Sequence, residues 1–186
     1  MTDHKECDGA SVGVLVTDER GRVLVGTRAD GAGLAPIAGH VWDEHDSYED
    51  AAAAEVWEET GMRVTKLEYV TGGWRANRCK RGDSPHGPGH HWQVFRATAT
   101  GTPHSADGSM LDLHWADHVE LNRAKWRTLQ RAQARISDAE WTADPGLEPV
   151  WVQWLHVAGI AVLSLADLHT VQTRLIEPGT ENGGER

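Results

Sequence analysis

The chain has 186 residues and a formal net charge of −10. This length suits one domain with an extension, and the acidic balance disfavours binding to nucleic acid or to an acidic membrane surface. The first residues lack the apolar run of a secretory signal, so we expect a cytoplasmic protein. The two cysteines, Cys7 and Cys79, have no zinc-binding spacing and are too few for a disulfide framework. They are predicted to be free thiols.

Short apolar and β-branched runs between turn residues predict six strands along the chain. The strands cover residues 10–17, 22–27, 37–42, 64–71, 91–98 and 111–116. The first two flank a turn-like segment, Asp18-Glu19-Arg20-Gly21, and are predicted to pair as a hairpin. Helical segments are predicted among and after the strands, so the chain is expected to be a mixed α/β domain.

A helix is predicted between the third and fourth strands, from Tyr48 to Thr60. Ser47 is a good N-cap residue, and Gly61 suits a left-handed C-terminal stop. The four alanines at 51–54 favour a helix and carry little bulk, so the helix can lie close to a sheet.

Three glutamates, Glu55, Glu58 and Glu59, recur in this helix at a spacing that places them on one face. Like charges so close together repel each other. A hard divalent cation removes that repulsion, because Mg²⁺ and Mn²⁺ prefer oxygen ligands. The spacing therefore predicts a metal site, against the alternative of an ordinary solvated helix face.

The stretch from Gly39 to Met62 resembles the motif of the Nudix hydrolases. That motif reads Gly, five residues, Glu, seven residues, then Arg-Glu-apolar-x-Glu-Glu-x-Gly-apolar. Residues 55–62 match its second half position by position. Ala54 stands where the family has an Arg that orients the catalytic carboxylates. Gly39 fits the position of the first Gly only with one residue inserted in the loop.

The resemblance implies a Nudix-type α/β/α sandwich with a mixed β-sheet over residues 10–136, with the motif at 39–62. It also implies an enzyme that hydrolyses the pyrophosphate bond of a nucleoside diphosphate linked to another group. The substitution at Ala54 leaves open a second function, a catalytically weak or inactive Nudix-fold protein that binds a nucleotide and acts as a regulator.

Site residues follow from the resemblance by position. Glu55, Glu58 and Glu59 would bind Mg²⁺ or Mn²⁺, joined by the carbonyl of Gly39. Glu58 and Glu59 are the predicted catalytic residues. Glu58 is favoured as the general base, with an acid from a downstream loop as the alternative.

Residues 72–90 are predicted to form a long loop that is basic within an acidic protein. Arginine gives forked contacts to phosphate oxygens and tryptophan stacks on bases. The predicted substrate-binding residues are Arg28, Trp74, Arg75, Arg78 and Arg81. An ordinary exposed loop explains the same composition equally well. His90 and His91 are neighbours on a strand, so one is expected to point inward.

A helix is predicted over residues 120–136, and residues 137–176 are predicted to form a helical C-terminal extension. Residues 150–176 are apolar on most sides, with polar interruptions and Gly159. A buried helix broken near Gly159 is favoured over a membrane span. Such a helix either covers the core or forms a homodimer interface. Residues 1–9 are predicted to be a tail, and residues 177–186 a disordered one.

Overall fold

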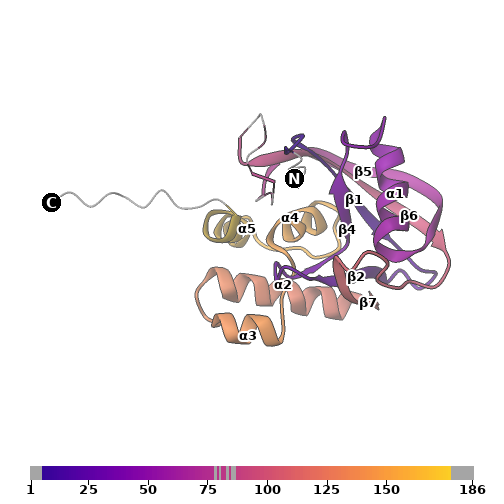
Figure 1. The fold of residues 1–186 in the computed structure, drawn as a ribbon. Coiled ribbons are helices and arrows are strands. Elements are labelled where there is room, and N and C mark those ends of the chain that lie inside the picture. The colour runs from indigo at the N-terminus through magenta and orange to yellow at the C-terminus, as the bar shows by residue number, and fades with distance from the viewer. Residues whose placement is uncertain (1–5, 78, 80, 83, 85–86, 177–186) are drawn as a thin grey trace.

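The computed structural model describes residues 6–77, 79, 81–82, 84 and 87–176 (Figure 1). The predicted tail at 177–186 and the predicted site residue Arg78 lie outside the described residues. Residues 7–9, which the sequence places in an N-terminal tail, pack against the domain, and the side chain of Cys7 is buried.

Seven strands within the described residues form two sheets. The four-stranded sheet has the order β4-β1-β6-β5, and it is mixed because β1 and β6 run parallel while the other pairs are antiparallel. Its strands are β1 (Ala10–Val16), β4 (Ile37–His40), β5 (Arg63–Ala76) and β6 (Gly89–Thr100). The three-stranded antiparallel sheet has the order β3-β2-β7. Its strands are β2 (Val23–Arg28), β3 (Leu34–Ala35) and β7 (Met110–Ala116).

The predicted pairing of the first two strands is wrong. Both strands form, but β1 and β2 belong to different sheets, and an isolated bridge joins Thr17, the residue after β1, to Val23 of β2. The reason is that β1 has β4 on one edge and β6 on the other, so no edge is left for β2. All seven residues of β1 are buried, which is the pattern of a strand covered on both faces.

The predicted loop at 72–90 is shorter than expected. β5 continues to Ala76 and β6 begins at Gly89, and these two residues pair at the end of the ladder. The two glycines at 72–73 suggested a loop. The long antiparallel pairing with β6 overrides that weak local preference, as tertiary context commonly does in strands.

The helices within the described residues are α1 (Tyr48–Thr60), α2 (His118–Ala132), α3 (Asp138–Ala143), α4 (Pro149–Val157) and α5 (Leu165–Val171), followed by a π-helical turn (Gln172–Ile176). The bounds of α1 are those predicted. The predicted break is confirmed, because α4 ends two residues before Gly159, whose φ is 73°. None of these helices combines the length and the apolar character needed to cross a membrane.

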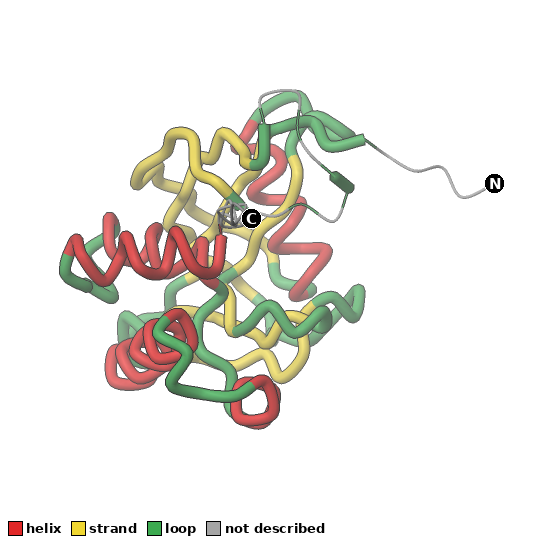
Figure 2. The backbone as a smooth tube through the Cα atoms, turned by 90° about the vertical axis from the view of Figure 1, so that its left-hand side faces the viewer, coloured by secondary structure: helices red, strands yellow, loops and turns green. Residues whose placement is uncertain are grey.

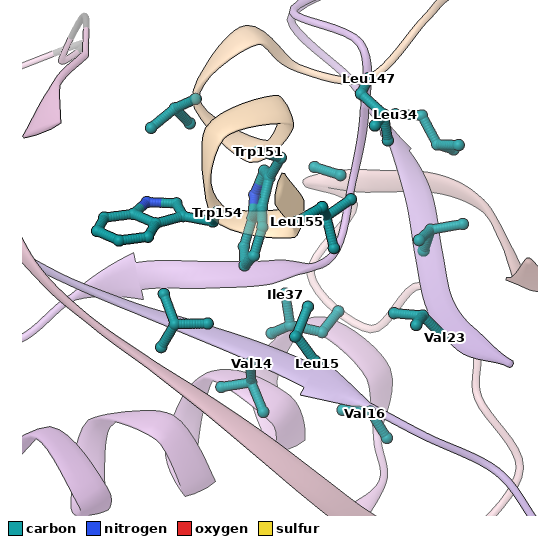
Figure 3. Packing of buried hydrophobic residues seen from close by; sticks show 14 of the residues in the cluster. Val14, Leu15, Val16, Val23, Leu34, Ile37, Leu147, Trp151, Trp154 and Leu155 are labelled. Carbon is teal, nitrogen blue, oxygen red and sulfur yellow. The ribbon is translucent and has the colours of Figure 1, made fainter. Parts of the chain in front are cut away.

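Helix α4 covers the core of the domain. Helices α1 and α4 lie on opposite sides of β1 and β4 (Figure 1), and the view turned by 90° shows the strands in the middle with helices around them (Figure 2). Trp151, Trp154 and Leu155 project from α4 toward the strands and are fully buried (Figure 3). A Cβ atom on Gly13 would lie only 2.7 Å from Cη2 of Trp151, so a glycine permits this close packing. A homodimer through this region stays a prediction.

Candidate active site

Helix α1 holds the predicted carboxylates, and its ends are fixed as the sequence suggests. The Ser47 hydroxyl accepts a hydrogen bond from the Asp50 N–H (3.0 Å). At the other end Gly61 adopts φ 68° and its N–H donates to the Trp57 carbonyl (2.8 Å). The helix packs so closely on the end of β4 that a Cβ atom on Gly39 would overlap the Glu55 carboxylate. A side chain at position 39 would therefore displace the Glu55 carboxylate from its present position.

Glu59 is buried and held by three contacts. Nη1 of Arg28 lies 3.3 Å from its Oε1, and the Ser109 hydroxyl donates to the same oxygen (3.1 Å). The Ala38 N–H donates to Oε2 (3.4 Å). Burial nevertheless raises the pKa of Glu59 to about 7, because desolvation disfavours the charged carboxylate more than these partners favour it.

Glu55 and Glu58 differ in exposure. Burial, followed by repulsion from Glu59 and Glu58, raises the pKa of Glu55 to about 8. Glu58 is exposed, and with Glu55 it lines a cavity of about 180 Å³ formed against the loop that follows β4. Neighbouring carboxylates that repel one another and are partly withdrawn from water suit a divalent cation, which supplies positive charge and takes oxygen ligands. The residues present therefore fit Mg²⁺ or Mn²⁺.

A further acid, Asp107, belongs to this group although the sequence did not single it out. It lies in the connection between β6 and β7, and its charge raises the pKa of both Glu55 and Glu59. Its Oδ1 accepts the Ser109 N–H (2.9 Å), which links it to the hydroxyl that contacts Glu59. The only hint in the sequence was the general expectation of an acid from a downstream loop.

Comparison with known protein families gives a match over most of the chain. The sequence profile described as NUDIX domain matches residues 8–144, about three quarters of the chain. The chain belongs to the NUDIX domain family. The profile spans the strands and helices α1, α2 and α3, and α4 and α5 follow it.

Solved structures resemble this Nudix protein in fold at low sequence identity. The NUDIX domain of Shewanella oneidensis NrtR in complex with ADP ribose has a TM-score of 0.51 and 14% identity, over 66% of this chain and 81% of that one. A MutT protein from Methanosarcina mazei Go1 has a TM-score of 0.49 and 17% identity, over 63% of this chain and 82% of that one. A MutT NUDIX hydrolase from Burkholderia pseudomallei has a TM-score of 0.46 and 19% identity, over 60% and 84%. A comparison with curated proteins gives no significant match.

The position of Arg28 bears on the missing arginine of the Nudix motif. Ala54 has no charge to offer the glutamates, but Arg28 reaches Glu59 from the end of β2. Its side chain is 20% exposed and that of Glu59 is 4% exposed, so the ion pair is largely shielded from water. In this Nudix protein a cation thus contacts Glu59 from strand β2 and not from helix α1.

The other predicted substrate-binding residues separate into two groups. Arg81 lies at the site, where it pairs with Asp43 and lines both the cavity beside Glu55 and a second cavity of about 240 Å³. Arg75 points elsewhere, because its guanidinium stacks over Trp154 of α4 (4.6 Å), and burial lowers its pKa. Trp74 is 39% exposed, and neither Trp74 nor Arg75 lines these two cavities.

The cavities adjoin one another beside the carboxylates. The 240 Å³ cavity is lined by Arg28, Gly39 and Arg81 among others. A larger cavity of about 490 Å³ lies next to it and shares Asp30, Asn77, Cys79 and Glu148 with it. Together they provide a recess that leads away from α1 toward α4.

A second polar cluster borders this recess. Within the part of the chain that the structure describes, one group of metal-ligand side chains has all its ligand atoms within 4.8 Å of one another: Cys7, His40, Cys79 and His90. Both cysteines are free thiols, as predicted. Burial raises the pKa of Cys7 to about 11 and lowers that of His90 to about 4. His90 is the inward-pointing member of the histidine pair, and His91 is exposed.

Proposed function

We propose that this Nudix protein hydrolyses the pyrophosphate bond of a nucleoside diphosphate derivative, with Mg²⁺ or Mn²⁺ as cofactor. The observation that carries the proposal is that the buried Glu59 and the half-buried Glu55 lie together on α1 against the end of β4, with the exposed Glu58 at the cavity beside them. Removing two neighbouring carboxylates from water is costly unless a cation or a proton compensates them.

Different residues would bind the metal, accept the proton of the attacking water and orient Glu59. Glu55, Glu58, Glu59 and the Gly39 carbonyl would hold the metal, which neutralises pyrophosphate charge and makes a bound water more acidic. Glu58 is exposed to the cavity, so its carboxylate can accept the proton of the attacking water. Arg28 and Ser109 fix the orientation of Glu59.

The substrate would occupy the adjoining cavities. Arg28 and Arg81 place two guanidinium groups on the walls of the 240 Å³ cavity, where they suit phosphate oxygens. The 490 Å³ cavity offers room for the rest of the nucleotide. Trp74, Arg75 and Arg78 stay predictions as substrate contacts.

The decisive experiment is a substrate panel of nucleotide sugars, dinucleotides and nucleoside triphosphates, with phosphate and monophosphate release measured with Mg²⁺, with Mn²⁺ and with a chelator. We expect metal-dependent turnover that falls at least about a hundredfold in Glu59→Gln, because a ligand and its charge are lost. Glu49→Gln, on the exposed first turn of the same helix, is the matched control and keeps the wild-type rate. Wild-type turnover in Glu59→Gln would remove this site from the mechanism.

The alternative is a Nudix-fold protein that binds a nucleotide without cleaving it, and the observation in its favour is Ala54. The same panel distinguishes the two functions when binding is measured by calorimetry alongside product release. Submicromolar binding of a nucleotide with no turnover under any metal condition would favour the regulator. The contact of Arg28 with Glu59 favours the enzyme, because Arg28 supplies the positive charge that an alanine at position 54 cannot supply.

A further inference from the structure

The cluster of Cys7, His40, Cys79 and His90 is assembled from four separate segments. Cys7 precedes β1, His40 ends β4, Cys79 lies between β5 and β6, and His90 is the second residue of β6. The sheet order places β4 and β6 on either side of β1. The cluster therefore lies at one end of the four-stranded sheet, where the N-terminal segment and the β5–β6 connection also arrive.

Sheet register explains why the two histidines converge. Ser11 of β1 pairs with His40 on one side and with Trp92 on the other. Paired residues share a face of the sheet, and alternate residues along a strand return to that face. His90, two residues before Trp92, therefore projects from the same face as His40. Their rings meet edge to face with centroids 5.2 Å apart.

Distances between the ligand atoms suit a tetrahedral metal ion. The Cys7 Sγ lies 3.0 Å from Nε2 of His90 and 3.9 Å from Nε2 of His40, and the Cys79 Sγ lies 3.4 Å from Nε2 of His40. Tetrahedral zinc, with bonds of about 2.3 Å to sulfur and 2.0–2.1 Å to nitrogen, separates sulfur from nitrogen by about 3.6 Å. The observed separations lie on either side of that value.

The surroundings orient the ligands as a metal site requires. His90 Nδ1 lies 2.7 Å from Oδ1 of Asn77, and an amide oxygen only accepts, so Nδ1 carries the proton. The lone pair of His90 is then on Nε2, the atom that faces the sulfurs. Fixing a histidine ligand through its other nitrogen is typical of metal centres. The Arg81 N–H also donates to the Cys79 Sγ (3.4 Å).

We propose that Cys7, His40, Cys79 and His90 bind a zinc ion as a structural site, separate from the carboxylate site on α1. Two thiolates and two imidazoles are the ligand set that zinc prefers, whereas Mg²⁺ and Mn²⁺ prefer oxygen. Four protein ligands complete the tetrahedron, so the zinc has no open position for substrate or water and serves to hold the fold.

The site would hold the β5–β6 connection against the substrate recess. His40, Cys79 and His90 all line the 240 Å³ cavity together with Arg28 and Arg81. Arg81 follows Cys79 by two residues and pairs with Asp43 of the loop after β4. A zinc ion that fixes Cys79 therefore also fixes Arg81 at the cavity wall, and His40 is the direct neighbour of Gly39.

The test uses the full chain, purified with reductant and without chelator. We expect about one zinc ion per chain by elemental analysis, the stoichiometry of a single four-ligand site. After removal of zinc, titration with Co²⁺ should give visible d–d bands and a thiolate-to-cobalt charge-transfer band, and added Zn²⁺ should abolish both. A folded wild-type chain that contains no zinc and gives no charge-transfer band overturns the proposal, and so does a Cys7–Cys79 disulfide that persists in reductant.

Variants assign the signal to these residues. Cys7→Ser and Cys79→Ser should each lose the zinc and the charge-transfer band, with folding checked by circular dichroism. His91→Ala is the matched control, since it removes the exposed neighbour of His90 and should keep both signals. The double variant Glu55→Gln/Glu59→Gln should also keep both, because carboxylates give no thiolate band. A charge-transfer band that survives in Cys79→Ser overturns the assignment of the metal site to these residues. The zinc test does not depend on whether the carboxylate site is catalytic.

Discussion

The two polar clusters of this protein lie side by side but are built in different ways. The carboxylates of Glu55, Glu58 and Glu59 come from five consecutive residues of one helix, and the helix alone puts them on one face. The ligands of the Cys/His cluster are separated along the chain by 33, 39 and 83 residues at the contacts that join them. Local geometry thus creates the first cluster, and only the folded sheet creates the second.

The end of β4 joins the two clusters through consecutive residues. Gly39 packs on the carboxylate of Glu55, and His40 contributes its Nε2 to the Cys/His cluster. Changes at one cluster should therefore leave the other intact only if they spare the backbone of β4. Substitutions at the carboxylate cluster and at the Cys/His cluster both test this condition.

Among the changes that test the link between the two clusters, Gly39→Ala has the largest expected effect. Because the new Cβ would overlap the Glu55 carboxylate, Glu55 must move, and a displacement of about 1 Å in a catalytic group costs roughly a hundredfold in rate. Steady-state kinetics on the best substrate of the panel measures the loss. The cobalt charge-transfer band should remain, because the pairing of His40 with Ser11 is not changed. Loss of that band as well would show that the clusters are not independent.

A smaller effect, between about tenfold and a hundredfold in kcat, is expected for Arg28→Ala, since Glu59 loses the cation that orients it. The matched variant is Arg28→Ala/Ala54→Arg, which restores the arginine of the Nudix motif on α1 itself. Partial recovery of kcat in the double variant would show that Arg28 positions the carboxylates. An effect on KM alone, without recovery, would instead assign Arg28 to substrate binding.

An effect on zinc affinity, with no direct effect on the carboxylates, is expected for Asn77→Ala, which removes the acceptor of the His90 Nδ1–H. Loss of such a partner typically weakens metal binding by about tenfold to a hundredfold. Competition of the protein with a zinc chelator gives the affinity. Asn77→Asp keeps an acceptor at this position and should preserve the wild-type affinity. Equal affinity in the alanine variant would mean that Asn77 does not orient His90.

How far the fold could be predicted differs between helices and strands. The bounds of α1 follow from Ser47, the alanine run and Gly61, because capping and helix propensity act within a few residues. The break at Gly159 follows for the same reason. The positions of the strands other than β3 were also predicted. The pairing of β1 with β4 and β6 was not, since register depends on partners distant in sequence.

The candidate site shows the same division. The glutamates and Gly39 could be named from their spacing, whereas Arg28 as the partner of Glu59 and the contribution of Asp107 could not. Both residues reach α1 from other parts of the chain. Arg75 has the positive charge that a phosphate contact needs, but in the structure its guanidinium stacks over Trp154.

By itself the sequence determined one helix with its caps, three acidic side chains on a common face, and the family to which this pattern belongs. Those properties depend on a repeat of 3.6 residues per turn and need no distant partner. The tertiary structure alone decided which strands are neighbours, which arginine reaches Glu59, and that two cysteines without any recognisable spacing meet two histidines. Such encounters depend on how the sheet closes and on which of its faces is buried, and no short stretch of residues carries that information.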